Sequence, residues 1–184
     1  AVDQLGQIAE ACHRSDLTFG LEVEANLIGQ TGQLLAEIEQ SLAGVIAEVK
    51  AAKLMGRGGA AFPTGTKWQA VHDEPAAPHY VVCNADESEP GTFKDREIMR
   101  WTPHQLIEGC AIAAYAIGAE RCYIYIRGEF TEPLRVMTAA VAEAYAKGAL
   151  GADVFGSGKR IDIVLHRGAG AYICGEETAM MNSI

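Results

Sequence analysis

The sequence predicts an α/β fold in which a parallel, Rossmann-like sheet is flanked by helices. Three short apolar runs, at 79–83, 122–126 and 161–165, have the β-branched and aromatic composition of buried strands. Helical patterns separate these runs, so strand and helix alternate along the chain. This alternation is typical of parallel sheets with right-handed crossovers. Ligands of such sheets bind beyond the carboxyl ends of the strands, which here are followed by 84–89 and 166–177.

The helices are predicted from apolar spacing and from capping residues. Apolar side chains recur at helical spacing over 33–54, which predicts one long helix, or two that break near Ser41. Gly56 is well placed as the C-terminal stop of this helix. Thr102 and Pro103 form an N-cap and first-turn pair. Further helices are expected over 102–117, from Thr131 to about 147, and from 175 or 176 onward.

The length and composition favour one main domain with a small appendage. We expect a mostly helical N-terminal region over 1–54, whose role the sequence leaves open, and an α/β domain over 55–184. The net charge of −9 argues against a nucleic-acid partner, because phosphate backbones bind basic surfaces. Apolar stretches are too short for membrane insertion, and no signal peptide is visible. The five cysteines include no CxxC pair, so no metal site is expected, and a reducing cytoplasm suits them.

A glycine-rich stretch at 56–68, G-R-G-G-A-A-F-P-T-G-T-K-W, is the first candidate binding element. Glycines let the backbone approach a ligand, and free amides in such a turn can hold an anion. Arg57 and Lys67 would add positive charge for a phosphate, while Phe62 and Trp68 could offer ring faces. The alternative is a plain connection between two elements. A Walker A loop is excluded by the spacing of Gly59, Gly65 and Lys67, so the nucleotide-binding loop is atypical.

Acidic side chains follow two of the predicted strands. N-A-D-E-S-E at 84–89 could bind ribose hydroxyls or a carboxamide, or could be a solvated turn. Glu176 and Glu177 could act similarly, although acids at a helix N-terminus are often only favourable to the dipole. G-A-G-A-Y-I-C-G at 168–175 does not fit the dinucleotide fingerprint, because its third glycine comes too late. No nucleophile or general base stands out, so no catalytic side chain is expected, and a bound flavin would supply the chemistry.

Three motifs together closely resemble the FMN- and NADH-binding subunit of respiratory complex I. They are the glycine stretch at 56–68, C-N-A-D-E-S-E-P-G-T-F-K-D-R at 83–96 and G-A-G-A-Y-I-C-G-E-E-T-A-M-M-N-S at 168–183. The same module resembles the diaphorase subunits of NAD-linked hydrogenases and formate dehydrogenases. The resemblance implies hydride transfer from NADH to a non-covalent FMN, followed by single-electron transfer to iron–sulfur clusters. A non-catalytic assembly module that keeps the fold is the alternative from another class.

The resemblance also implies roles for particular residues. The FMN and its phosphate would be held by Gly56, Arg57, Gly58, Gly59 and Lys67, and the flavin would be lined by Asn84, Asp86, Glu87, Tyr172, Gly175 and Glu176. The NADH side would comprise Phe62, Glu89 and Glu177. Ala61 departs from the family, in which many members have glycine there.

The resemblance finally implies a setting. The family continues beyond the position of Ile184 with a β-grasp-like domain and a domain holding a [4Fe–4S] cluster, so this chain is expected to be a fragment. Partners would be NADH and other subunits of a multi-subunit oxidoreductase, including an iron–sulfur subunit. The location would be the peripheral arm of a membrane complex, on its cytoplasmic or matrix side.

Overall fold

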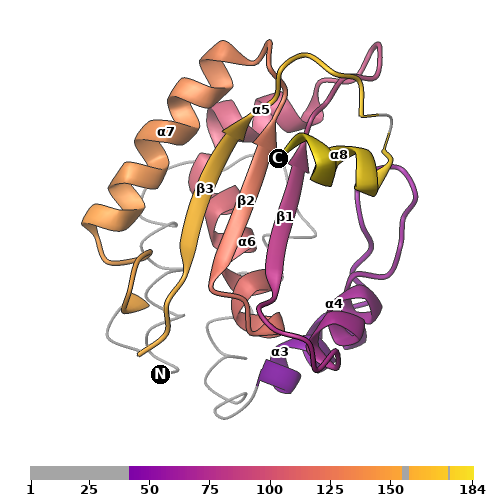
Figure 1. Ribbon diagram of the computed structural model, residues 1–184, viewed down its shortest axis with the longest axis vertical. Helices are drawn as coiled ribbons and strands as arrows, with labels where there is room; N and C mark the ends of the chain where they lie inside the picture. Colours follow the sequence, from indigo (N-terminus) through magenta and orange to yellow (C-terminus); the bar gives the residue numbers. More distant parts are fainter. Residues whose placement is uncertain (1–41, 155–157, 174) are drawn as a thin grey trace.

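A parallel sheet of three strands forms the centre of the computed structural model, which describes residues 42–154, 158–173 and 175–184 (Figure 1). The strands are β1 (Tyr80–Ala85), β2 (Arg121–Ile126) and β3 (Asp162–Arg167), and they lie in the order β1-β2-β3. Their register aligns Cys83 with Ile124 and Ile124 with Leu165. The predicted parallel α/β sheet is therefore confirmed, with β1 and β3 each ending slightly later than the sequence indicates.

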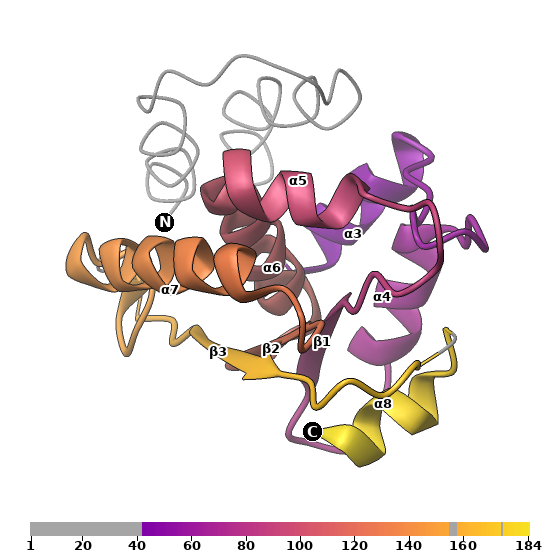
Figure 2. The same cartoon turned by 90° about the horizontal axis from the view of Figure 1, so that it is seen from above.

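Helices cover the two faces of the sheet unequally. Figure 2 shows α5 (Lys94–Trp101), α6 (Pro103–Ile117) and α7 (Thr131–Ala146) together on one face. The short α8 (Glu177–Ser183) lies on the other face. Each long crossover, β1 to β2 and β2 to β3, passes through the same helical layer, as a right-handed parallel arrangement requires. The two faces of the sheet therefore differ in cover, with α8 on the side opposite the helical layer.

Side chains of β2 alternate between the two faces, as the pleat of a strand dictates. Cys122, Ile124 and Ile126 are fully buried in the main core under the helical layer. Tyr125 points the other way and packs with Ile173 and Met180. Its hydroxyl also lies 2.8 Å from Ser183 Oγ, which fixes the end of α8 on the sheet.

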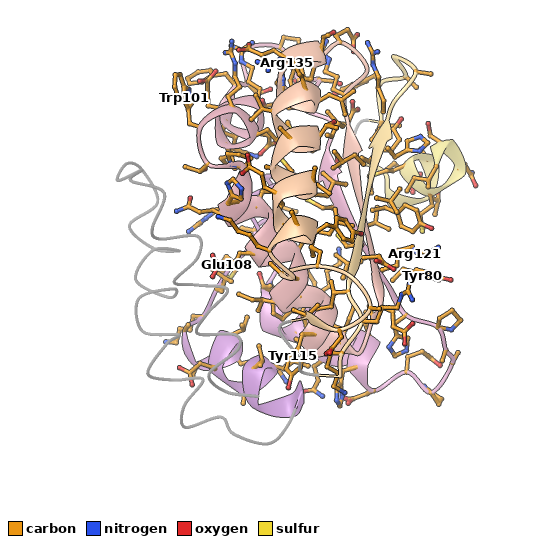
Figure 3. The ribbon with its side chains drawn as sticks, turned by 90° about the vertical axis from the view of Figure 1, so that its left-hand side faces the viewer. Tyr80, Trp101, Glu108, Tyr115, Arg121 and Arg135 are labelled. Carbon is orange, nitrogen blue, oxygen red and sulfur yellow. The ribbon has the colours of Figure 1, made fainter. Side chains whose placement is uncertain are left out.

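The amino ends of the strands are more exposed. Tyr80 and Arg121 are register partners at the starts of β1 and β2, and Figure 3 shows them close together. The ring of Tyr80 also lies 6.2 Å from that of Tyr123, centroid to centroid. Tyr80 is half exposed, so the predicted buried strand at 79–83 is an edge strand with one partly open face.

Two further helices, α3 (Leu42–Ala51) and α4 (Thr64–His72), pack beyond the β1 edge. Val45 and Ile46 of α3 contact Ala116 of α6 in a second small core. Gly65 lets α3 and α4 approach closely, because a Cβ there would lie 2.5 Å from Lys50 Cγ. Residues 33–41 lie outside the described part of the chain, so the choice between one helix and two stays a prediction.

The predicted end of this helix and the extent of the following loop are both wrong. The helix ends at Ala51, and Lys53 then turns the chain with a φ of 52°. Gly56 does not cap it; its amide donates to Phe62 O instead. The stretch expected as a loop up to Trp68 is helical from Thr64 onward. Tertiary packing on α3 overrides the weak helix preference of glycine and threonine there.

The helix α5 was not foreseen, and the expected cap of α6 acts differently. Thr102 precedes Pro103, and α6 ends at Ile117 with Gly118 in a left-handed conformation, φ 70°, as predicted. However, Thr102 Oγ1 donates to Ile98 O of α5 at 3.3 Å and caps no amide of α6. In the described part of the chain, no helix is both long and apolar enough to cross a membrane.

Candidate functional site

The carboxyl ends of the three strands are tied to one another by hydrogen bonds. Gly168 N donates to Ile126 O at 2.8 Å, and Arg167 Nε donates to Gly128 O at 2.9 Å. Arg127 Nη1 donates to Glu87 O at 2.9 Å, which joins the segment after β2 to the segment after β1. The strand-end segments are therefore held as one platform, at the edge where ligands of parallel sheets bind.

Two glycines make this platform possible. A Cβ on Gly128 would lie 2.4 Å from Gly168 O, and a Cβ on Gly168 would lie 2.8 Å from Tyr125 Oη. Both positions therefore need glycine for the close approach of neighbouring chain segments. Gly168 serves packing, whereas a Cβ on Gly170 or Gly175 would meet no described atom within 4 Å. Those two have φ values of 93° and 74°, so glycine suits them for conformation, and their backbones are open to a ligand.

Two of the expected site segments meet directly. Tyr172, in the segment after β3, donates its hydroxyl to Glu89 Oε2, in the segment after β1. The two residues are 83 positions apart in the chain. Tyr172 is 60% exposed, so its ring remains open to solvent beside this contact. The structure thus brings together a residue expected on the flavin side and one expected on the NADH side.

Asn84 and Asp86 form a tight turn at the end of β1. Asn84 Oδ1 accepts a hydrogen bond from Asp86 N at 2.9 Å. Asp86 Oδ2 is buried and has no hydrogen-bond partner among the described residues. A buried carboxylate oxygen without a donor is costly, and a ligand that donates to it removes that cost. This orphaned acceptor fits a polar ring edge or a hydroxyl of a bound group.

Two other expected ligands, Glu87 and Glu176, bind backbone amides. The buried Glu87 carboxylate accepts from Asp95 N at 3.0 Å and from Arg96 N at 3.2 Å, in the first turn of α5. Glu176 accepts from Ala179 N at 2.6 Å and caps α8. The hydroxyl of Thr178, together with the amides at the start of α8, lowers the pKa of the Glu176 carboxyl. Both carboxylates thus anchor helix starts beside the strand ends.

The glycine stretch forms a closed loop on the β1 side of the sheet. Gly56 N donates to Phe62 O at 2.9 Å, and Thr64 N donates to Leu54 O at 2.9 Å, so the base of the loop is pinned. Residues 57–62 are all exposed, and Phe62 is 54% exposed. In Figure 1 the loop lies beyond β1. The loop therefore presents its backbone, Arg57 and Phe62 outward.

The interior of the loop is open around its glycines. A Cβ on Gly58 or Gly59 would meet no described atom within 4 Å, so neither glycine is required by packing. Gly59 has a φ of 111°, which only glycine adopts easily. Ala61 has a φ of 50°, a left-handed conformation that strains alanine, at the position where the resemblance implies glycine. The free space and the turned backbone suit a cradle for an anionic group.

Lys67 and Trp68 lie on α4 rather than in the loop. Lys67 is exposed. Trp68 packs against both hydrophobic cores, so its expected ring face for a planar ligand is used in packing. Glu177 is the first residue of α8, and its side chain lies outside the described part of the structure.

Arg127 is a residue of the site that the sequence reasoning missed. It follows β2 directly, binds Glu87 O, and lies 5.5 Å from the centroid of the Phe130 ring. Its position after the middle strand is the signal that would have found it. Among the described residues, no three His, Cys, Asp or Glu side chains are grouped to hold a metal ion.

Comparison with known families identifies the module. Residues 49–184 match the model of the Nuo51 FMN-binding domain. The chain is 59% identical over 140 residues to an NADH-quinone oxidoreductase subunit of Rickettsia bellii (strain OSU 85-389), covering 76% of this chain and 34% of the relative. It is 54% identical over 144 residues to the mitochondrial NADH-ubiquinone oxidoreductase 51 kDa subunit of Neurospora crassa, covering 76% and 29%.

A solved structure shows the same fold. The crystal structure of an NAD⁺-reducing [NiFe]-hydrogenase in the H₂-reduced state matches with a TM-score of 0.69 and 39% identity. The match covers 79% of this chain and 24% of that chain. The chain thus spans about a third of the length of the curated relatives that it matches. The resemblance drawn from the three motifs is confirmed: this chain belongs to the family of the Nuo51 FMN-binding domain.

Proposed function

We propose that this chain forms the FMN- and NADH-binding part of an NADH dehydrogenase flavoprotein subunit. The observation that carries the proposal is the platform at the strand ends, where Tyr172 binds Glu89 and where Asp86 Oδ2 lacks a donor among the described residues. These groups come from two segments far apart in the chain, and each belongs to a motif of the family. The open glycine loop supplies the third side.

The phosphate of FMN would lie against the glycine loop. Gly56 pins the base of the loop through its amide, and Gly58 and Gly59 leave the backbone open to an anion. Arg57 and Lys67 add positive charge. The N-termini of α5 and α8 need not take part in phosphate binding, because their first amides are bonded by Glu87 and Glu176. The loop, together with Arg57 and with Lys67 of α4, would hold the phosphate.

The flavin would be lined by the strand-end segments. Asp86 Oδ2 is an acceptor for a donor on the bound group, and Asn84 holds the Asp86 amide in place. Glu87, Tyr172, Gly175 and Glu176 complete this side, with Glu87 and Glu176 fixing the helices that border it. A bound FMN would supply the redox chemistry, namely hydride acceptance from NADH and single-electron release to iron–sulfur clusters.

NADH would lie between Phe62 and Glu89, with Glu177 as the third contact. The Phe62 ring is exposed on the loop and offers an apolar face to a planar base. Glu89 is an acceptor for hydroxyl groups, and Tyr172 holds its carboxylate in position. The carboxylates in this region would disfavour an added 2′-phosphate, which supports NADH over NADPH.

The relatives support a proposal for the setting of this chain. In the proposed complex the chain is part of a longer subunit, divided near residue 54 into a helical region and the flavin domain. Its partners are an iron–sulfur subunit and the further domain that holds a [4Fe–4S] cluster. We place it in the peripheral arm, on the cytoplasmic or matrix side. The likeness to an NAD⁺-reducing hydrogenase supports a diaphorase subunit as the second candidate.

The test uses the full-length subunit. FMN content is measured by absorbance after release, and NADH oxidation is followed with ferricyanide as acceptor. Glu89→Gln is expected to raise the KM for NADH while FMN content stays unchanged. Glu120→Gln, an exposed acid before β2 at the opposite edge, is the matched control and should behave as wild type. A full-length protein that neither retains nor rebinds FMN refutes the proposal. Unchanged KM and kcat in Glu89→Gln refute the placement of NADH.

A further inference from the structure

Arg127 joins the segments that follow β1 and β2. Its backbone amide donates to Ala85 O at 3.2 Å, so the ladder between the two strands continues by one bond. Its side chain reaches further, and Nη1 donates to Glu87 O at 2.9 Å. Nε donates to Glu129 Oε2 at 3.2 Å, and the guanidinium carbon lies 5.5 Å from the centroid of the Phe130 ring. These contacts together hold the guanidinium in one orientation.

Glu87 is fixed at both of its ends. Its carbonyl accepts from Arg127, and its buried carboxylate accepts from Asp95 N and Arg96 N at the start of α5. The side-chain bonds tie Glu87 to a helix, whereas the bond to its carbonyl ties it to the segment after β2. Loss of the Arg127 bond would therefore free the main chain at Glu87 to turn, while its carboxylate stays on α5.

The groups that the proposed function assigns to FMN and NADH lie on either side of Glu87 in the chain. Asp86 comes directly before it, and Asp86 Oδ2 is the buried acceptor that lacks a donor among the described residues. Glu89 comes two positions later and is bonded by Tyr172. A rotation of the main chain at Glu87 would change where the Asp86 carboxylate points, and small misplacements of a binding group are costly.

We propose that Arg127 is a positioning residue for FMN, which holds the Glu87 carbonyl and thereby sets the direction of Asp86 Oδ2. The inference rests on the proposed function, because it concerns the binding of the same flavin. Arg127 acts through the segment 84–89 and not by touching the flavin. The alternative is a packing role alone, in which Arg127 covers Phe130 and pairs with Glu129. The two roles predict different effects of substitution.

The FMN affinity of the full-length subunit is measured by adding FMN to the FMN-free protein and following flavin fluorescence. Arg127→Met keeps an unbranched side chain beside Phe130 and removes the donors and the charge. We expect the FMN dissociation constant to rise about tenfold, the low end for a hydrogen bond to a charged group, because the Arg127 side chain is 32% exposed. Arg135→Met removes the same charge from an exposed position of α7 and should bind FMN as the wild type does.

Arg127→Lys separates the bond to Glu87 from the packing. Lysine keeps the charge and a donor for Glu87 O, but it has no planar guanidinium to place over Phe130. We expect Arg127→Lys to bind FMN within about threefold of the wild type. A loss as large as that in Arg127→Met overturns the proposal, because the packing would then be what matters. Unchanged FMN affinity in Arg127→Met also overturns it.

A double-mutant cycle tests whether Arg127 acts through Asp86. Asp86→Ala removes the orphaned acceptor, so the double variant with Arg127→Met should fall short of the product of the two single losses by about threefold or more. Lys67→Ala removes a charge from α4, and its loss should multiply with that of Arg127→Met within about twofold. Losses that multiply in both cycles indicate general destabilisation and overturn the proposal.

Hydrogen exchange of the FMN-free protein gives a readout that needs no flavin. The amide of Asp95 is bonded by the Glu87 carboxylate, so its protection depends on where Glu87 lies. In Arg127→Met we expect 84–96 to exchange up to about tenfold faster and 103–117 of α6 to exchange as in the wild type. Unchanged exchange over 84–96 contradicts the positioning role. A wild-type protein that binds no FMN refutes the proposed function, while faster exchange in the variant would still show that Arg127 holds this segment.

Discussion

Replacing Gly128 by alanine tests how the strand ends are held together. The added Cβ would lie 2.4 Å from Gly168 O and 3.1 Å from Gly170 N. Both neighbours are backbone atoms, so no flexible side chain can move aside. The segments after β2 and β3 must separate, at a cost of about 1–3 kcal/mol for overpacking. Reduced freedom of the unfolded chain offsets about 0.4–1 kcal/mol of this cost.

Gly109→Ala is the matched control for the same chemical change. Gly109 is exposed on α6, and a Cβ there would meet no described atom within 4 Å. Alanine is better than glycine inside a helix by about 0.5–1 kcal/mol, so this variant should gain stability. Thermal unfolding of the two purified variants gives the comparison. At about 2–4 °C per kcal/mol for a chain of this length, we expect Tm to fall by up to about 10 °C for Gly128→Ala and to rise by about 1–4 °C for Gly109→Ala.

The Gly128→Ala variant also tests whether packing at the strand ends affects FMN binding. Because Gly128 holds the platform that carries Tyr172 and Glu89, Gly128→Ala should retain less FMN than Gly109→Ala at the same temperature. Equal Tm values for Gly128→Ala and the wild type would show that the strand ends do not approach as closely as the structure has them. The reasoning on the platform would then be wrong.

Three further predictions concern stability. Glu108 of α6 (Figure 3) is buried, its Oε2 has no partner among the described residues, and burial raises its pKa from 4.5 to about 7. The unfolded chain therefore loses this proton at a lower pH than the folded chain, so the free energy of unfolding falls by about 3 kcal/mol between pH 4.5 and 7. Urea unfolding across this pH range should show the fall in the wild type and not in Glu108→Gln. The same pH profile in both proteins would contradict the prediction. The ring nitrogens of His79 contact Ile117 O at 2.8 Å and Glu74 O at 3.1 Å, and these bonds raise its pKa. The stabilisation by protonated His79 is complete below the ordinary pKa of about 6.5 and is lost as pH rises through the raised pKa. His79→Ala should therefore lower the free energy of unfolding more at pH 5.5 than at pH 8.5. Equal decreases at the two pH values would refute this. Ala61→Gly should relieve about 1–2 kcal/mol of left-handed strain and lose about 0.5–1 kcal/mol to chain entropy. We therefore expect a urea midpoint at or above that of the wild type, and a lower midpoint would contradict the prediction.

The sheet was predictable because its signals are local. β2 and the end of α6 follow from the run Y-I-Y-I and from Gly118, which the sequence displays directly. The helix α4 was not predictable in the same way, because Thr64 and Gly65 disfavour a helix and the contact with α3 stabilises one. The role of Thr102 was not predictable for the same reason, since its hydroxyl donates to Ile98 O of the preceding helix α5 and does not cap α6.

The site was predictable in its residues more than in their contacts. The strand-end rule placed Glu89 and Tyr172 at one edge, and the structure joins them. The engagement of Glu87 by α5 was not foreseen, because α5 itself was not. The packing of Trp68 depends on two cores that no local pattern reveals. The roles of the site residues toward FMN and NADH remain predictions.

The affinity of the full-length subunit for FMN in a Lys67→Ala variant tests the central claim most directly. Lys147→Ala is the matched control, because Lys147 is exposed just after α7, outside the glycine loop and the strand-end segments. Loss of a charge-assisted contact to the phosphate should weaken FMN by about 1.5–3 kcal/mol, which is roughly 10- to 150-fold. The control should bind FMN as the wild type does. An unchanged FMN dissociation constant in Lys67→Ala would contradict the claim that α4 and the glycine loop hold the flavin phosphate.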